Sequence, residues 1–589
     1  MHSACGRYVI VFNGEIYNHL ELRRLLENSG EAPEGGWRGT SDTETLITAL
    51  RAWGPTRALQ ATRGMFAFAL WDNASRRVTF ARDRLGEKPL YVSRLRNGIA
   101  FSSELKALEA LQGFTNEIDR GSLDFYLRHA YIRAPNSIFK GTTKLLPGTY
   151  LTISENDIVN LARSGDFLAN HRQTYWSLAE SALEGIRDPF TGSEEEAIDE
   201  LGRVLGKAVE RQMISDVPLG AFLSGGIDST AIVAMMQAGS STKVRTFTVG
   251  FSEEHFDESR FASEVAKHLG TEHTTVVLSA DDALAKVDEI PSIWDEPFAD
   301  ASQLPTILVS EVARAHVTVA LSGDGGDELF GGYERYRLAT SGWQRFGRVP
   351  RSVRGVAARG VRVFSPASWD KLLRAVPGIP KGLTGDRIHK LSGILAAEDL
   401  FGFYDGFLSS WKAPGALLLG ENPPSELHWS GNRLLPSHVE SLMLLDALDY
   451  MPDDVLVKVD RASMSRSLES RAPMLDVDVV DLAWRFPLSM KRRGDVGKWV
   501  LRKLVHRHVP QEIVERPKMG FGVPIDAWLR GPLKGWAQAH LTDDTLVSAG
   551  IDPKPVTAAW NAHQAGTENH QYFLWNVLNY MKWRGHRGL

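Results

Sequence analysis

The chain has 589 residues, of which 43% are hydrophobic and 24% are charged, and its formal net charge is −5. This composition is that of a globular protein, and the length predicts several domains. A mildly acidic chain lacks the basic face of a dedicated nucleic-acid binder, so no nucleic-acid partner is expected. No apolar run approaches the roughly 18 residues of a membrane span, which predicts no membrane partner and a cytoplasmic location.

The only cysteine, Cys5, excludes an internal disulfide and any metal site built from several thiolates. The opening residues, MHSACGRYVIVF, contain a five-residue apolar stretch. A signal-peptide core needs about 7 to 15 such residues, so no signal peptide is expected.

The first 110 or so residues predict short antiparallel strands in stacked sheets. Strands are expected over residues 8–12, 64–71, 77–81, 90–92 and 99–102, and helices over 20–28 and 43–53. The stretch from 163 to 192 is polar and includes a proline and a glycine near its end, which predicts an irregular linker.

After the linker, Ser193 and Glu196 form the signature of a helix-opening capping box. Strands and helices then alternate, which is typical of a parallel sheet covered by helices. Strands are expected over 219–223, 244–249, 273–278 and 317–321, and helices over 230–237 and 258–269. The last 250 or so residues are expected to be mostly helical.

A glycine-rich loop, LSGGIDST at residues 223–230, lies between a predicted strand and a predicted helix. Its glycines allow the backbone to approach a phosphate, and the free N–H groups of a helix start bind anions. Asp228 would repel a phosphate unless it holds a magnesium ion that bridges to it. A glycine turn with a polar helix cap is the alternative interpretation.

A second loop, SGDGGDE at residues 322–328, follows the strand predicted at 317–321. Ligands of open α/β sheets gather at the carboxyl ends of strands, so its acidic residues are candidates for binding a metal or a cationic group. An acidic glycine-rich surface loop is the alternative.

The first loop resembles the PP-loop of the ATP pyrophosphatases, and the two loops together resemble the synthetase half of glutamine-dependent asparagine synthetases. Residues 458–476, 497–502 and 516–521 are similar to further segments of that family. The N-terminal part resembles the family's glutamine amidotransferase domain at NGEIYN (13–18), SDTE (41–44), RDRLG (82–86) and SELK (103–106).

This resemblance implies two domains of α/β and α+β class. Residues 1–162 would form an αββα sandwich of the N-terminal-nucleophile hydrolase type, the type 2 glutamine amidotransferase domain, incomplete at its N-terminus. Residues 163–192 would be the linker. Residues 193–589 would form an ATP-pyrophosphatase domain with a parallel sheet and a helical C-terminal part.

The resemblance also implies the chemistry, which is the adenylation of an aspartate carboxylate by ATP with Mg²⁺, followed by amidation with ammonia and release of AMP and pyrophosphate. Asp228 and Asp327 would hold the metal and the pyrophosphate. Asp324 would support acyl-adenylate formation at a position where the family often has Glu, and Lys498 would neutralise charge as pyrophosphate leaves. Out of context, a lysine such as Lys498 is more often a solvated surface residue. The implied ATP-binding residues are Leu223, Ser224, Gly225, Gly226, Ser229, Val249, Ser322 and Gly323.

The implied glutamine-binding residues are Asn13, Gly14, Glu15 and Asp42. The family's nucleophile is a cysteine exposed by removal of the initiator methionine, whereas here residue 2 is His2. An extended strand would place Cys5 roughly 26 Å from Asn13, so Cys5 is interpreted as a strand residue and not a nucleophile. The glutaminase half is therefore expected to be inactive as given. A truncated chain or misplaced start, and an enzyme that uses free ammonia, both stay open.

The acceptor is also left open. Residues 295–306, DEPFADASQLPT, stand where acceptor-binding residues are expected. They resemble a subgroup in which asparagine synthetases mix with amidotransferases that act on sugar carboxylates in polysaccharide biosynthesis. A lactam-forming relative is a further alternative. Small-molecule substrates are the expected partners, and a homodimer is left open.

Overall fold

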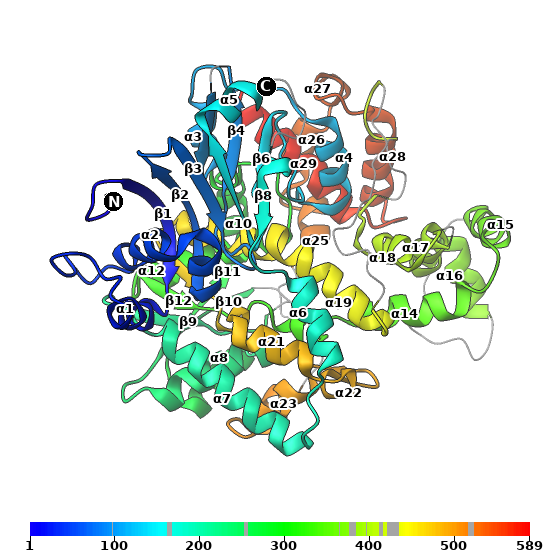
Figure 1. Cartoon of the computed structure of the whole chain (residues 1–589). Helices are drawn as coiled ribbons and strands as arrows, with labels where there is room; N and C mark the ends of the chain where they lie inside the picture. Colours follow the sequence, from blue (N-terminus) through cyan, green and yellow to red (C-terminus); the bar gives the residue numbers. More distant parts are fainter. Residues whose placement is uncertain are drawn as a thin grey trace.

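The computed structural model describes residues 1–96, 98–161, 168–251, 257–364, 366–375, 385–395, 397–411, 416–420, 435–515 and 523–589. Figure 1 shows the N-terminal strands in blue beside a second sheet that the helices α7 (Glu194–Gln212) and α8 (Ile227–Gly239) cover. In the described part of the chain, no helix is both long enough and apolar enough to cross a bilayer.

The N-terminal region is a sandwich of two antiparallel sheets, as predicted. The larger sheet has the order β1 (Tyr8–Ile16), β2 (Gly64–Asp72), β3 (Arg77–Arg82), β7 (Thr149–Ser154), β8 (Arg172–Thr174). The smaller sheet has the order β5 (Gly98–Ser102), β4 (Tyr91–Leu95), β6 (Thr142–Lys144). Phe80, Val92 and Leu151 fill the space between the sheets. The helices α1 (His19–Asn28) and α2 (Asp42–Ala61) cover the outer face of the larger sheet.

Strand β1 lies at an edge of the larger sheet and extends to Ile16, beyond its predicted end at Phe12. The chain before it turns back, because His2 pairs with Val9 in an isolated antiparallel bridge. Cys5 lies exposed in that turn, so its interpretation as a strand residue is wrong.

The expectation of irregular structure in 163–192 is wrong for the part that the structure describes, whereas the role of this stretch as a linker stays a prediction. Strand β8 completes the larger sheet by pairing with β7. Helix α6 (Leu178–Arg187) follows, capped by the Ser177 side chain. The buried side chains of Leu178 and Ala182 belong to the core of the second region. A ten-residue helix with a narrow apolar stripe leaves little signal in a mainly polar stretch.

The second region contains the predicted parallel sheet. Its order is β11 (Glu272–Leu278), β10 (Arg245–Phe251), β9 (Leu219–Phe222), β12 (Val319–Leu321), β13 (Glu469–Arg471), and every neighbouring pair is parallel. The capping box of Ser193 and Glu196 opens α7 as predicted. The edge strand β13 has no counterpart among the predicted strands, because three residues are too few to show a pattern.

The remaining chain is mainly helical, as expected. The principal helices are α3 (Leu105–Glu109), α4 (Arg120–His129), α9 (Ser259–Leu269), α12 (Gln303–Arg314), α14 (Glu334–Phe346), α15 (Arg351–Arg362), α16 (Pro366–Ala375), α17 (Gly385–Ile394), α18 (Leu400–Leu408), α19 (His438–Leu448), α20 (Leu456–Met464), α21 (Val477–Arg485), α23 (Trp499–His506), α25 (Ile525–Arg530), α26 (Lys534–His540), α27 (Asp543–Ser548), α28 (Pro553–Gln564) and α29 (Gln571–His586).

Candidate active site

The two glycine-rich loops meet at the carboxyl ends of the neighbouring parallel strands β9 and β12. A Cβ atom on Gly323 would lie 2.7 Å from the Ser229 nitrogen, and one on Gly326 would lie 2.4 Å from Asp228 Oδ1. Neither distance is compatible with a side chain. These glycines are therefore what allows the second loop to pack directly on the first.

Hydroxyl groups hold the first loop in shape. The Ser224 and Ser229 oxygens lie 3.0 Å apart, and the Ser224 N–H donates to Ser229 Oγ at 3.1 Å. Gly225 has a positive φ of 71°, a conformation that glycine adopts without strain. Helix α8 starts immediately afterwards with Gly226 as its N-cap residue. The loop thus presents a helix N-terminus at the sheet edge, which is favourable for an anion.

Lys498 reaches this site from the residue before α23, where it has a left-handed φ of 58°. Its Nζ lies 2.7 Å from Asp327 Oδ1 and also forms an ion pair with Asp228. Lys498 is only 4% exposed, so the alternative of a solvated surface lysine is wrong. Burial lowers the pKa of Lys498, but the two carboxylates outweigh this effect and raise it. The lysine is therefore fully protonated at neutral pH.

The same cluster provides oxygen ligands for a metal. No group of three or more His, Cys, Asp or Glu side chains converges as a metal site among the described residues. Mg²⁺ in nucleotide enzymes is commonly held by one or two carboxylates together with phosphate oxygens and water. The pair Asp228 and Asp327 fits that requirement. A Cβ on Gly332 would come within 2.0 Å of Asp327 Oδ1 and 2.1 Å of Lys498 Cε, so the cluster depends on this glycine as well.

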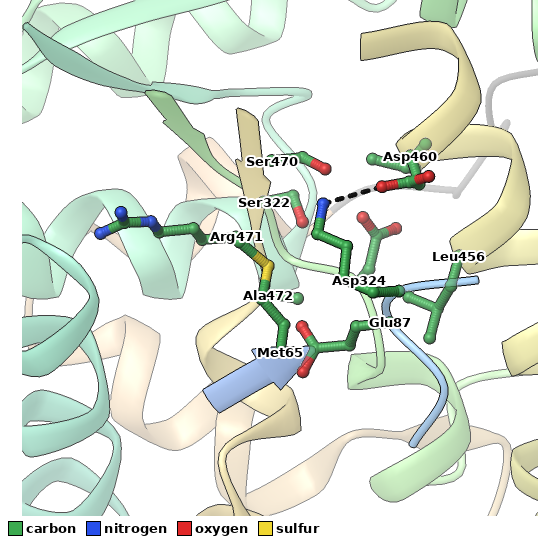
Figure 2. Close-up of a pocket in the computed structure, with 11 residues that line it drawn as sticks. Met65, Glu87, Ser322, Asp324, Leu456, Asp460, Ser470, Arg471 and Ala472 are labelled. Atoms are coloured by element: carbon green, nitrogen blue, oxygen red, sulfur yellow. Dashed lines mark hydrogen bonds and ion pairs between the residues drawn. The ribbon is translucent and has the colours of Figure 1, made fainter. Parts of the chain in front are cut away.

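Asp324 lies beside a pocket between the sandwich and the parallel-sheet region (Figure 2). Burial raises the pKa of Asp324. The sandwich contributes Glu87, whose pKa is raised well above its ordinary value by burial and by the charge of Asp83. Residues that line the pocket from the two sides include Met65, Glu87, Lys88, Ser322, Asp324, Asp460 and Arg471.

Sequence reasoning assigned no individual role to two lysines, Lys88, which is buried and lines this pocket, and Lys458, which is half-buried. Lys88 Nζ lies 2.8 Å from Asp460 Oδ1, and this ion pair joins the sandwich to α20. Lys458 Nζ lies 3.3 Å from Asp300 Oδ2. Lys458 lies within a segment quoted for the family resemblance, but only the folded chain shows which carboxylate it meets.

The predicted glutamine-binding residues lie around the end of β1. Asn13 Nδ2 donates to Ser103 Oγ at 3.0 Å, and Asp42 Oδ2 accepts the Ile16 N–H at 2.9 Å. Gly14 is required where β1 approaches β2, because its Cβ would lie 2.0 Å from the Met65 oxygen. Burial, together with the nearby Asp42 carboxylate, raises the pKa of Glu15 to about 7. Cys5 precedes the first residue of β1, whereas these residues lie towards its other end.

Comparisons with known proteins show which family the chain resembles in each of its two regions. Residues 200–585 match the asparagine synthase family model, and residues 1–163 match a glutamine amidotransferase domain model. A Mycobacterium tuberculosis protein provisionally named a glutamine-hydrolyzing asparagine synthetase is 35% identical over 99% of the chain and 85% of its own length. Glutamine-hydrolyzing asparagine synthetase 1 of Bacillus subtilis is 31% identical over 98% of the chain and 85% of its length. The amidase chyE of Penicillium rubens is 26% identical over 95% of the chain and 82% of its length.

The chain belongs to the asparagine synthase family. It is accordingly an enzyme of the carbon–nitrogen ligase class that uses ATP. The segment 516–521, which resembles a signature of the same family, lies outside the residues that the structure describes.

The segment 295–306, which is predicted to bind the acceptor, begins with two carboxylates that contact the sandwich. Leu105 N–H donates to Asp295 Oδ2 at 2.8 Å, and Lys144 Nζ lies 2.6 Å from Glu296 Oε2. Both carboxylates are buried against the sandwich and hold it to the synthase region. Asp300, further along the segment, instead faces Lys458, so acceptor binding by this segment stays a prediction.

Two predicted ATP-binding residues of the synthase region, Leu223 and Val249, lie on or directly after neighbouring parallel strands. Leu223 and Val249 are both buried, but they belong to different hydrophobic clusters. Leu223 N–H bonds to the Phe247 oxygen at 2.9 Å, so the two residues still lie at the ends of neighbouring strands. Their binding of adenosine stays a prediction.

Proposed function

We propose that this enzyme converts aspartate to asparagine with ATP, Mg²⁺ and ammonia. The observation that carries the proposal is Lys498, which is buried against Asp228 of the first loop and Asp327 of the second. A lysine and two carboxylates that meet at a helix N-terminus and at the ends of parallel strands are suited to hold a metal-bound triphosphate. The names of the mycobacterial and Bacillus relatives support aspartate as the acceptor.

The reaction consists of two substitutions. A carboxylate oxygen of the acceptor attacks the α-phosphorus of ATP, the bond from that phosphorus to the β-phosphate oxygen breaks, and pyrophosphate leaves. Ammonia then attacks the carbonyl carbon of the acyl-adenylate, loses a proton, and AMP leaves with the electron pair of the broken C–O bond.

The chain's own groups have distinct parts in the first substitution. The start of α8, with Ser224 and Ser229, would receive the pyrophosphate oxygens. Asp228 and Asp327 would hold Mg²⁺, which neutralises phosphate charge when bound. Lys498 would stabilise the negative charge that develops on the leaving pyrophosphate, an effect worth about 10²–10³ in rate for one donor. Asp324 would act beside the acyl-adenylate.

The pocket between the two regions would receive ammonia for the second substitution. Glu87 from the sandwich and half-buried Asp324 both line it, and burial raises the pKa of each carboxyl. Asn13, Gly14, Glu15 and Asp42 would bind glutamine where glutamine is the nitrogen donor.

The deciding experiment supplies aspartate, Mg-ATP and ammonium and detects asparagine by mass while AMP is counted. Asparagine in equal amount to AMP is the expected result. AMP without asparagine would refute aspartate and direct the search to a sugar carboxylate or another acceptor. If a folded sample forms neither AMP nor asparagine, that result would contradict the adenylation chemistry itself. Repeating the reaction with glutamine in place of ammonium tests the N-terminal region separately.

A further inference from the structure

The helices α14 to α18 form a basic projection at the edge of the molecule (Figure 1). Residues 334–411, which include these helices, contain 13 arginines and lysines and six acidic residues, whereas the whole chain has a net charge of −5. From Arg335 to Trp369 the sequence has no acidic residue. Positive charge is thus concentrated on the part of the chain that projects furthest from the two sheets.

Helix α15 within this projection has a well-defined inner face. Arg354 is 5% exposed and donates hydrogen bonds to the carbonyl oxygens of Val349, Leu395 and Ala397 at 2.6–2.9 Å. Ala358, one helical turn later, is also buried. These contacts fix the rotation of the helix, and therefore determine which side chains face outwards.

The outer face of α15 is apolar. Val353 is 54% exposed, Val356 is 69% exposed, and Val363, directly after the helix, is 76% exposed. Their spacing of three and seven residues places them on one side of a helix. Phe364 and Leu372 continue the surface at 57% and 54% exposure.

Cationic side chains flank this apolar surface. Arg359 is exposed on α15 next to the side that carries Val356 and Val363, and Arg351 is exposed at the first residue of the helix. Arg351 forms an ion pair with Glu398, which lies just before α18, so one flank is partly neutralised. An apolar stripe bordered by arginines is the pattern of helices that lie in the plane of a lipid headgroup layer.

We propose that the outer face of α15, with Phe364 and Leu372, docks the enzyme on an anionic lipid surface. A second copy of the chain fits this face poorly, because it would bring two arginine-rich surfaces together in the same interface. A bilayer supplies both the negative headgroups that attract arginines and an apolar layer that accepts valine and phenylalanine side chains. Peripheral docking needs no spanning helix. It is therefore compatible with the lack of a long apolar run in the sequence, on which the expectation of no membrane partner was based.

The projection is directly connected to the candidate active site. Helix α14 starts at Glu334, the residue after Tyr333, and the Tyr333 hydroxyl donates to Glu328 of the second loop at 2.6 Å. Docking through α15 would therefore hold the adenylating site at a defined orientation to the lipid surface. The proposal does not depend on which carboxylate is the acceptor.

Vesicle co-sedimentation of the full chain tests the proposal, with equimolar phosphatidylglycerol and phosphatidylcholine vesicles compared with phosphatidylcholine alone. We expect binding about ten-fold tighter to the anionic vesicles, and weaker at about 0.5 M than at about 0.1 M NaCl because salt screens the arginines. The double variant Val356→Asn and Val363→Asn removes apolar surface without changing the charge, and should bind the anionic vesicles about ten-fold more weakly. The double variant Arg351→Gln and Arg359→Gln should lose the preference for anionic lipid.

Val547→Asn is the matched control, since Val547 is 51% exposed on α27, far along the chain from the projection. It should bind vesicles like the wild type. Circular dichroism and AMP formation should be unchanged in all variants, because none of these side chains lies in the candidate active site. The proposal is overturned if the wild type fails to bind anionic vesicles, if it binds both vesicle types equally, or if the valine variant binds as tightly as the Val547 control.

Discussion

The two halves of the enzyme use their polar residues in different ways. In the synthase region, Asp228, Asp327 and Lys498 come from three distant segments and face one another at the ends of strands. In the sandwich, Asn13 and Asp42 bond to a serine and to a main-chain N–H, all within or near one strand. The first set is a cluster of charged groups whose ion pairs a charged ligand can replace. The second set forms hydrogen bonds that also stabilise the fold of the sandwich.

This contrast has an energetic basis. Gathering buried charges costs desolvation energy, and replacing one partner leaves another charge uncompensated. The synthase cluster should therefore respond sharply to single substitutions. The sandwich residues should respond less when ammonia is supplied directly, because the adenylation site lies elsewhere.

The largest effect is expected from Lys498→Met. Removing this charge should lower the rate of AMP formation by about 10²–10³, as for the loss of a group that stabilises developing charge. The assay is AMP release with saturating ammonium. Lys534→Met, at an exposed lysine, is the control. A rate within a factor of two of the control would show that Lys498 has only a structural role. On the sandwich side, Asn13→Ala should stay near the wild-type rate in the same assay.

The next test asks whether the synthase cluster depends on the close approach of the Gly332 backbone to Asp327 and Lys498. Gly332→Ala would place a Cβ 2.0 Å from Asp327 Oδ1 and 2.1 Å from Lys498 Cε, so the ion pair must shift. A misplacement of catalytic groups by about 1 Å can cost roughly 10²-fold in rate, and kcat should fall accordingly. Gly535→Ala serves for comparison, because its Cβ would meet nothing within 4 Å. Equal kcat for the two variants would argue against a preformed cluster.

A third test addresses the junction of the two regions. Lys88 and Asp460 are 4% and 8% exposed, so Lys88→Met leaves a buried carboxylate without its cation and should destabilise the fold by about 3–5 kcal/mol. Arg76→Met breaks the exposed Arg76–Glu155 pair and should cost at most about 1 kcal/mol. Denaturant unfolding at pH 7 compares the two. Similar midpoints would mean that the buried pair does not hold the junction.

The smallest expected effect is a pH dependence shared by both regions. Burial, reinforced by a neighbouring aspartate in each case, raises the pKa of Glu15 and of Glu328 to about 7. Their unfolded forms lose the proton near pH 4.5, whereas the folded forms keep it up to about pH 7. This contribution to stability is therefore complete below about pH 4.5 and is lost as the pH rises to about 7.

Glu328→Gln removes one titrating group, so the fall in unfolding free energy between pH 5 and about pH 7 should become shallower. Glu15→Gln should do the same to a smaller degree, since Glu15 is less buried. Unfolding midpoints measured between pH 5 and about pH 7 give the pH dependence of stability for each variant, with Glu184→Gln, at an exposed glutamate, as the reference. An unchanged slope in Glu328→Gln would contradict the raised pKa.

Much of this architecture could be predicted because its signals are local. The strands at 64–71 and 77–81 and the strands of the parallel sheet have apolar patterns long enough to read. Helix α6 and strand β13 were missed since each is short and is stabilised by residues far away in sequence. Only the structure shows that the acidic start of the segment 295–306 contacts the sandwich, because a carboxylate looks the same in a sequence whether it binds a ligand or a neighbouring domain.

The sequence by itself determined the fold class, the two glycine-rich loops and the residue types suited to a phosphate and metal site, since these depend on local patterns and on backbone freedom at glycines. Only the tertiary structure decided that Lys498 faces Asp228 and Asp327, that Asp295 and Glu296 face the sandwich, and that α15 presents its valines outwards. Those outcomes depend on burial and on long-range packing, which bring together charges that lie far apart in the sequence and leave the valines of α15 exposed.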